Sequence, residues 1–340
     1  MVCSKLGFMP PGSSTNLGVA DVVNALEFLQ NTVPSFGGDK GKITLFGQSS
    51  GAGMIRALLA VPSADSLFRS AILQSDPMVK FEAIAFQSDN ANIPVQNYGF
   101  LSTKTQSTLR NSFIETTGCD ANNQSCFDSL SIDNILSAQA KLVSQASTLD
   151  PAAGLAEPIR PVLDGSLLRS PLDSPDRFPA VNKPILVTTV ANESGPTVYS
   201  LIPTWLPFLA FGSVVKTMLG NERAKVVSSS PYYKVGWTQD AREEAEVLAT
   251  DYMWKCPSWT FARSWAKNGG TTYVGVFTVG ADHPHNSGVG YCGKDGVVCH
   301  EDDIMIVVSP SRIYVSTRET MLKTNSLGQS AIPPSSKSAS

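Results

Sequence analysis

Four short apolar segments recur along the chain and predict the strands of one sheet. They span residues 43–46, 68–74, 184–190 and 272–279. The first two are separated by an apolar segment, residues 52–60, whose length and composition predict a buried helix. Two strands about one helix apart form a βαβ unit, in which the strands are parallel and the crossover is right-handed. The pattern therefore predicts an α/β fold with a mostly parallel sheet flanked by helices.

Helical spacing of apolar residues predicts two further helices. The first begins at Asp21, a residue suited to a helix N-terminus, and ends by Pro34. The second covers residues 240–252, where charged side chains are expected on one face. Its opposite face is predicted to bury Ala245, Leu248, Ala249 and Tyr252.

Length and composition place the chain among globular proteins with a sizeable core. It has 340 residues, 42% of them hydrophobic, and a mean hydropathy near zero. We expect one domain over residues 1–324, followed by a Ser/Pro-rich disordered tail over 325–340.

The net charge of −3 gives no basic surplus, so nucleic acid is not an expected partner. The most apolar stretch, 201–219, contains two prolines and a lysine, so no integral membrane segment is expected.

Four cysteines are arranged as two closely spaced pairs. Cys119 and Cys126 flank one polar loop, and Cys292 and Cys299 flank another, which is typical of small disulfide-closed loops. Asn123, in the first loop, begins a glycosylation sequon. Both features indicate an extracellular full-length protein, although the first residues hold no apolar region long enough for a secretory signal.

The remaining cysteines, Cys3 and Cys256, have no evident partner in the sequence. A free, buried thiol is the simplest expectation for each of them.

The segment from Ile43 to Gly53, ITLFGQSSGAG, predicts a strand, a tight turn and a helix in succession. The turn has the form G-x-S-x-G, in which a serine sits on a strained backbone above a sheet. Ser49 is the candidate nucleophile, and the N–H of Ser50 is the candidate oxyanion donor. Glycines 47 and 51 are expected to let the strand and the helix approach closely. The alternative is an ordinary Gly/Ser-rich turn, since five-residue patterns of this kind also arise by chance.

A serine nucleophile needs a base that takes its proton and an acid that orients the base. Glu193 directly follows the predicted strand at 184–190, and His300 follows the last predicted strand. Side chains at the carboxyl ends of parallel strands meet at one edge of a sheet. Each residue alone is most simply a polar loop residue, but their order after the correct strands predicts a catalytic set of Ser49, Glu193 and His300.

A metal site is a weaker alternative for the last part of the chain. Its candidate ligands would be His283, His285, Cys292, Cys299 and His300. Their spacing matches no common zinc finger, and a disulfide between the cysteines would remove both thiolates. We therefore predict neither a metal nor a cofactor.

Several of these segments together resemble the type-B carboxylesterase/lipase family, which includes cholinesterases and many fungal lipases. The region 16–53 is similar to the family's nucleophile region, although the family more often has Glu and Ala at the positions of Gln48 and Ser50. Asn192-Glu193-Ser194-Gly195 is similar to its acid loop, in which the glycine usually follows the glutamate directly. The histidine motif is matched by residues 298–304, especially in its fungal form with Cys before His. Gln74-Ser75 and residues 251–257 also fit, so the resemblance covers about residues 5–310.

The resemblance implies an α/β-hydrolase that cleaves small-molecule or lipid carboxylic esters. Ser49 would form the acyl-enzyme, His300 would act as base and then acid, and Glu193 would orient His300. The family's Gly-Gly segment upstream of the serine, which supplies further oxyanion donors, has no counterpart before Ser49 except Gly37-Gly38 in another turn. We therefore expect a chain truncated at both ends, with a sheet incomplete at the N-terminal side. An inactive remnant, or a non-enzymatic binding module of the same fold, is the alternative, and the oligomeric state is not predicted.

Overall fold

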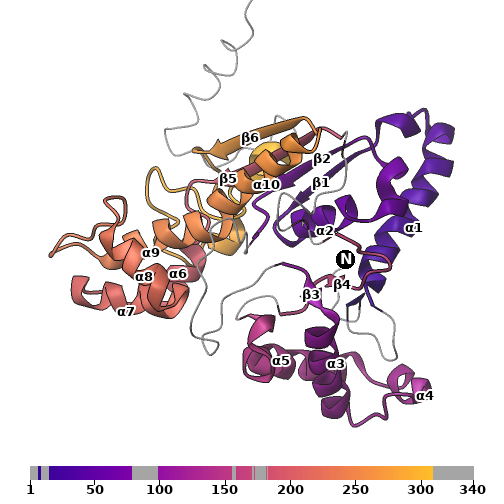
Figure 1. Ribbon diagram of the computed structural model, residues 1–340, viewed down its shortest axis with the longest axis horizontal. Coiled ribbons are helices and arrows are strands. Elements are labelled where there is room, and N and C mark those ends of the chain that lie inside the picture. The colour runs from indigo at the N-terminus through magenta and orange to yellow at the C-terminus, as the bar shows by residue number, and fades with distance from the viewer. Residues whose placement is uncertain are drawn as a thin grey trace, which may run out of the picture.

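A computed structural model describes residues 7–8, 15–78, 99–154, 158–170, 172, 181 and 183–308. The chain forms a central sheet of four parallel strands in the order β1-β2-β5-β6 (Figure 1). The four predicted strands are confirmed as β1 (Thr44–Gln48), β2 (Ser70–Gln74), β5 (Ile185–Val190) and β6 (Thr272–Phe277). The predicted tail at 325–340 lies outside the described residues, as does Cys3.

Three helices pack against this sheet and share one hydrophobic core with it. They are α1 (Leu17–Thr32), α2 (Ser50–Leu59) and α10 (Cys256–Lys267). The helix predicted after the first strand is α2, and seven of its ten residues are buried. Two aromatic side chains of α10, Phe261 and Trp265, are almost fully buried in the same core. Burial of such large apolar groups is the main stabilising contribution to a fold of this kind.

The first predicted helix begins earlier than its sequence suggests. It begins at Leu17 rather than at Asp21, and Asn16 precedes it with a left-handed φ of 56°. The Asn16 side chain donates to the backbone oxygen of Val162 and accepts from its N–H, both at 2.7 Å. These contacts span 146 residues, so the start of α1 is fixed by a distant segment rather than by a local cap.

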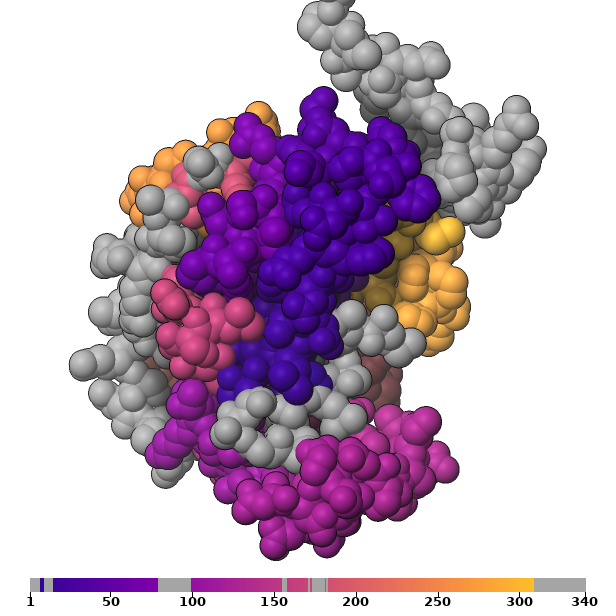
Figure 2. Space-filling model, turned by 90° about the vertical axis from the view of Figure 1, so that its right-hand side faces the viewer, coloured from indigo at the N-terminus to yellow at the C-terminus, as the bar shows by residue number. Residues whose placement is uncertain are grey.

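Two groups of helices extend away from the sheet (Figure 1). One lies at one end of the molecule, below α1 in the view of Figure 2, and comprises α3 (Thr103–Thr117), α4 (Gln124–Asp128) and α5 (Ile132–Leu149). The short parallel pair β3 (Leu101–Ser102) and β4 (Val162–Leu163) adjoins it. The other group has its own core and comprises α6 (Gly195–Leu201), α7 (Phe208–Leu219), α8 (Asn221–Ser229) and α9 (Ala241–Thr250).

The second predicted helix, at 240–252, is α9, and the π-helical turn η7 (Asp251–Lys255) joins it directly to α10. The remaining elements are short: η2 (Val33–Phe36), η3 (Lys40–Lys42), η4 (Pro62–Leu67), η5 (Pro151–Ala153), η8 (Pro284–Asn286) and α11 (Ile304–Val308). Among the described residues, no helix combines the length and the apolar character needed to cross a bilayer.

Both predicted disulfides are present, between Cys119 and Cys126 and between Cys292 and Cys299. Cys256 is a free thiol, as expected, but the expectation that it is buried is wrong. It is the first residue of α10, and that position leaves its side chain exposed.

Candidate active site

Ser49 lies between β1 and α2 in a strained backbone conformation. Its φ of 54° and ψ of −122° lie outside the regions that a residue with a side chain normally adopts. The turn is held by two backbone hydrogen bonds, from Ser49 N to the Gln74 oxygen and from Gly53 N to the Ser49 oxygen, at 2.9 and 3.0 Å. Strain of this kind persists only where the surroundings enforce it, and it is concentrated at functional sites.

The two glycines of the turn differ in what they make possible. A Cβ atom at position 47 would lie 2.6 Å from the backbone carbon of Gly51, so Gly47 is required for the close approach of strand and helix. A Cβ atom at position 51 would meet nothing within 4 Å. The expectation of a steric role is therefore confirmed for Gly47 and wrong for Gly51.

Glu193 and His300 form a short, partly buried hydrogen bond. His300 Nδ1 lies 2.6 Å from Glu193 Oε2, and the glutamate side chain has no exposed surface. The other carboxylate oxygen, Oε1, accepts from the N–H of Val190 at 2.8 Å. Both oxygens of the acid thus have donors, and this fixes the orientation of the imidazole ring.

The segments that carry these two residues are joined directly to each other. Asn192 N donates to the Val298 oxygen at 2.9 Å, and Val298 N donates to Asn192 Oδ1 at 3.1 Å. A Cβ atom at Gly195 would lie 2.8 Å from the sulfur of Cys299, so this glycine lets the acid loop pack against the disulfide. A glycine two positions after Glu193 is therefore compatible with the pairing of Glu193 and His300.

The charges around His300 favour its protonated form. Burial on its own lowers the pKa of His300, but the hydrogen bond and the charge of Glu193 outweigh burial, and the charges of Glu301 and Asp303 act in the same direction. The net result is a pKa above the usual value of 6.5. The ring of Trp254 lies 5.8 Å from the imidazole, centroid to centroid, and covers part of it.

The second nitrogen of His300 contacts Gln48 rather than Ser49. If Nδ1–H donates to Glu193, Nε2 is left as an acceptor, and the amide nitrogen of Gln48 lies 3.3 Å from it. In the part of the chain that the structure describes, no hydrogen bond joins Ser49 Oγ to His300. The structure therefore brings His300 to the serine turn through the residue before Ser49, a contact that the sequence does not predict.

Ser50 is the first residue of α2 and is exposed. The N–H of a first helical residue has no acceptor within its own helix, and it carries part of the positive end of the helix dipole. This N–H is thus available to an anionic oxygen beside Ser49.

Glu246, a buried carboxylate that the sequence did not indicate as part of the site, contacts the acid loop. Glu246 lies on the buried side of α9 with no exposed surface, so the prediction that the charged residues of this helix share one exposed face is wrong for it. Its oxygens accept from Asn192 Nδ2 at 3.0 Å and from Thr250 Oγ1 at 2.6 Å, and its backbone oxygen accepts from Ser194 Oγ. Burial raises the pKa of Glu246.

The five candidate metal ligands do not form one site. Cys292 and Cys299 are joined in a disulfide, so neither is a thiolate, and His300 is bound to Glu193. His283 and His285 lie beside Glu301 instead.

A cavity of about 340 Å³ opens at the N-terminal end of α2, beside Ser50. Its wall is largely apolar and includes Phe8, Met54, Phe100, Ile159 and Pro161. Arg56 and Asp76 form a buried ion pair of 2.8 Å in the same wall.

Comparison with solved structures places this fold among the α/β-hydrolases. A thermophilic PNB esterase matches 89% of this chain and 56% of its own, with a TM-score of 0.63 and 21% sequence identity. The sequence signature of the carboxylesterase family matches residues 4–326. The chain therefore belongs to the carboxylesterase family.

Two relatives differ in how much of this chain they match. The cAMP-regulated D2 protein of Dictyostelium discoideum is 28% identical over 259 residues, which is 74% of this chain and 43% of that protein. The para-nitrobenzyl esterase of Bacillus subtilis (strain 168) is 45% identical over 62 residues, which is 18% of this chain and 13% of that protein. The chain spans 43% of the length of the cAMP-regulated D2 protein and 56% of the length of the thermophilic PNB esterase.

Proposed function

We propose that this protein is a serine carboxylic-ester hydrolase with Ser49 as nucleophile, His300 as general base and Glu193 as the acid that orients His300. The observation that carries the proposal is the 2.6 Å hydrogen bond between His300 and a fully buried Glu193, beside a serine in a strained turn. Membership of a family of carboxylesterases supports the reaction class.

In the proposed reaction, Ser49 Oγ attacks the ester carbonyl while His300 Nε2 takes the hydroxyl proton. The Nδ1–H of His300 stays hydrogen-bonded to Glu193, which stabilises the imidazolium that forms. The N–H of Ser50 donates to the oxyanion of the tetrahedral intermediate. His300 then protonates the departing alcohol, and water releases the acid from the acyl-enzyme. For the first step, the Nε2 atom must exchange Gln48 for Ser49 as its partner.

The substrate is proposed to be a small-molecule or lipid ester. The apolar cavity beside Ser50 supports this class, since an apolar wall binds the acyl or alcohol part of an uncharged ester. Relatives named as esterases include the para-nitrobenzyl esterase of Bacillus subtilis and the juvenile hormone esterase of Tribolium castaneum. No cofactor is needed for this reaction.

We further propose that the full-length protein is extracellular and that residues 1–324 form a single domain. Two disulfides support an oxidising compartment. Asn123 is the proposed glycosylation site, and its side chain is exposed on the loop closed by Cys119 and Cys126. Its Oδ1 accepts from Cys126 N, and this hydrogen bond does not use the amide nitrogen to which a glycan would be attached.

The function is tested by labelling the 340-residue chain with a fluorophosphonate probe, which reacts only with an activated serine. Stoichiometric labelling, located by mass spectrometry on Ser49 and lost in Ser49→Ala, is the expected result, followed by turnover of p-nitrophenyl esters. A chain that is folded by circular dichroism but carries no label would support the inactive remnant or binding module instead.

A further inference from the structure

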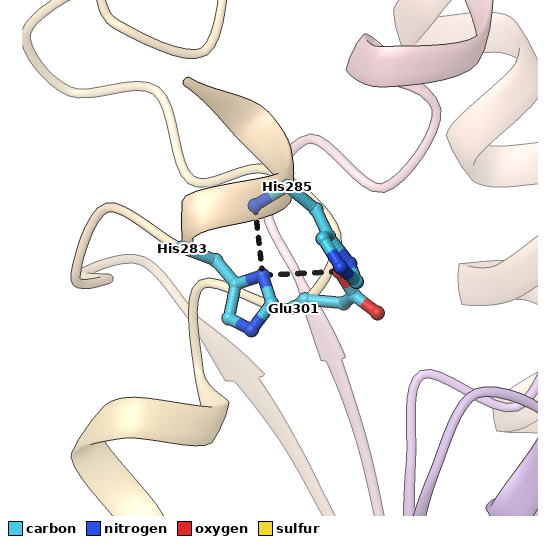
Figure 3. Close-up of side chains that lie close together, drawn as sticks. All are labelled: His283, His285 and Glu301. Atoms are coloured by element: carbon cyan, nitrogen blue, oxygen red, sulfur yellow. Dashed lines mark hydrogen bonds and ion pairs between the residues drawn. The ribbon is translucent and has the colours of Figure 1, made fainter. Parts of the chain in front are cut away.

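Three side chains on the surface beside the active site converge on one point. His285 Nδ1 lies 2.9 Å from Glu301 Oε2, and His283 Nδ1 lies 3.1 Å from the same oxygen. The potential ligand atoms of the three residues all lie within 4.8 Å of one another. Figure 3 shows the two imidazole rings and the carboxylate turned toward a common centre.

His283 Nδ1 has two polar neighbours of opposite kind. His283 Nδ1 meets a donor, the backbone N–H of His285 at 3.4 Å, and an acceptor, Glu301 Oε2 at 3.1 Å. One ring nitrogen carries either a proton or a lone pair. His283 Nδ1 can therefore bond only one of these neighbours at a time. When His285 Nδ1–H donates to Glu301, His283 Nδ1 is left with a lone pair that faces the same carboxylate oxygen and could bind a cation there.

The backbone at Glu301 is strained. This residue has a φ of 76°, a left-handed conformation that favours glycine over a residue with a side chain. Its carboxylate contacts both His283 and His285. The strained backbone thus holds a carboxylate against two imidazoles.

The loops that carry the three residues are fastened to each other. The buried Asp302 carboxylate accepts from the N–H of His283 at 3.0 Å and from Asn286 Nδ2 at 2.9 Å. Asn286 Nδ2 also donates to the His300 oxygen at 2.7 Å. The loop that carries His283 and His285 is thereby fixed against the residues that flank Glu301, which provides the preorganised support that a ligand set requires.

We propose that His283, His285 and Glu301 bind a divalent cation of intermediate hardness, namely Zn²⁺, with water as the fourth ligand. Two imidazoles and one carboxylate are a donor set that zinc accepts, and zinc bonds of about 2.0–2.2 Å would place tetrahedral ligand atoms roughly 3.4 Å apart. The separations in the structure start at 2.9 Å and do not exceed 4.8 Å, which is compatible with that value. His285 is 78% exposed, so the ion has an open path to the site.

The proposal is tested by zinc binding alone and does not depend on ester hydrolysis. Chelator-treated 340-residue chain is titrated with zinc chloride by calorimetry, and bound zinc is counted by elemental analysis after gel filtration. One equivalent is expected. His285→Gln and Glu301→Gly are each expected to raise the Kd at least about tenfold, since each removes one of three protein ligands. Glu222→Gln, which changes an exposed carboxylate on α8, is the matched control and should leave the Kd unchanged.

Two further variants distinguish zinc binding at His283, His285 and Glu301 from zinc binding elsewhere on the chain. Glu301→Gly should lose zinc affinity but unfold at the same or a higher temperature, because glycine relieves the backbone strain. Loss of zinc binding together with a large drop in Tm would overturn the proposal. A Cys3→Ser, Cys256→Ser double variant should bind zinc as the native chain does. Absence of zinc binding, an unchanged Kd in His285→Gln, or loss of binding in the cysteine variant would each refute the assignment.

Discussion

Glu193 holds His300 through a hydrogen bond of 2.6 Å, and the two residues are 107 positions apart in the sequence. The acid has no exposed surface and is also bound by the N–H of Val190. Because the imidazole is tied at Nδ1, its other nitrogen faces the turn that carries Ser49, where it meets Gln48. This pair is the part of the proposed catalytic set that is already assembled.

Replacing Glu193 with glutamine should slow fluorophosphonate labelling by about 10³–10⁴-fold. The amide preserves shape but removes the charge that stabilises the imidazolium and selects the Nδ1–H tautomer. The labelling rate is compared at fixed pH with that of Glu222→Gln, which alters an exposed carboxylate on α8 and should label normally. Glu193→Gln protein that is folded by circular dichroism and labels at the native rate would contradict the role assigned to Glu193.

The pH dependence of labelling should report the raised pKa of His300. A general base works in its neutral form, so the rate should increase with pH and reach half its maximum above pH 6.5, the usual value for histidine. In Glu193→Gln the largest stabilising charge is gone, and the residual rate should have its midpoint at lower pH. A native midpoint at or below pH 6.5 would show that burial, not Glu193, dominates.

The same shift has a consequence for stability. Because the pKa of His300 is higher in the folded chain than in the unfolded chain, the protonated imidazole stabilises the fold. That contribution is fully present below about pH 6.5 and is lost as the pH rises through the folded pKa. The difference in unfolding free energy between the native chain and His300→Gln should therefore shrink with increasing pH in denaturant titrations. A difference that grew with pH would reverse the assigned sign.

Removing the Gln48 side chain should free His300 for Ser49. A hydrogen bond of this type contributes about 0.5–1.5 kcal/mol, so Gln48→Ala should speed labelling by about 2- to 10-fold. Gln30→Ala, on α1, removes an amide of the same kind away from the site and should have no effect on the rate. Slower labelling in Gln48→Ala would mean that the amide positions His300 productively rather than competing with the serine.

Local patterns in the sequence were sufficient to predict the four strands, and they nominated the three residues that we propose as catalytic. The strands were predictable because continuous apolar runs mark a parallel sheet, although only the two central strands, β2 and β5, are largely buried, and the edge strands β1 and β6 keep exposed apolar side chains. Ser49 was predictable because a strand, a turn and a helix surround it. The contacts of Asn16 with Val162, of Glu246 with Asn192 and of Gln48 with His300 were not predictable. Each joins a polar residue to a partner far along the chain, and no periodicity encodes such a partner.

The two disulfides provide a matched comparison, since each joins cysteines seven positions apart. Loop closure of this size contributes about 2–3 kcal/mol in the chain-entropy account, so replacing either pair by serine should cost a similar amount of unfolding free energy. Only the Cys292–Cys299 pair adjoins His300 and packs against Gly195. The Cys292→Ser, Cys299→Ser chain should therefore also label more slowly, whereas the Cys119→Ser, Cys126→Ser chain should label at the native rate. Equal labelling by both variants would show that the disulfide has no part in holding His300.

The two glycines of the serine turn allow the steric argument to be tested with one methyl group each. Gly47→Ala places a Cβ atom 2.6 Å from the Gly51 backbone carbon, and this backbone cannot move away without displacing α2 from β1. We expect a loss of at least about 2 kcal/mol in unfolding free energy, together with loss of labelling as Ser49 is displaced. Gly51→Ala meets open space inside the first turn of α2, where alanine is the better helix former. It should leave stability within about 1 kcal/mol of the native value, on the stabilising side, and keep Ser49 reactive. Denaturant titration of both variants decides the matter, and equal destabilisation would show that the turn needs flexibility at both glycines rather than space at one.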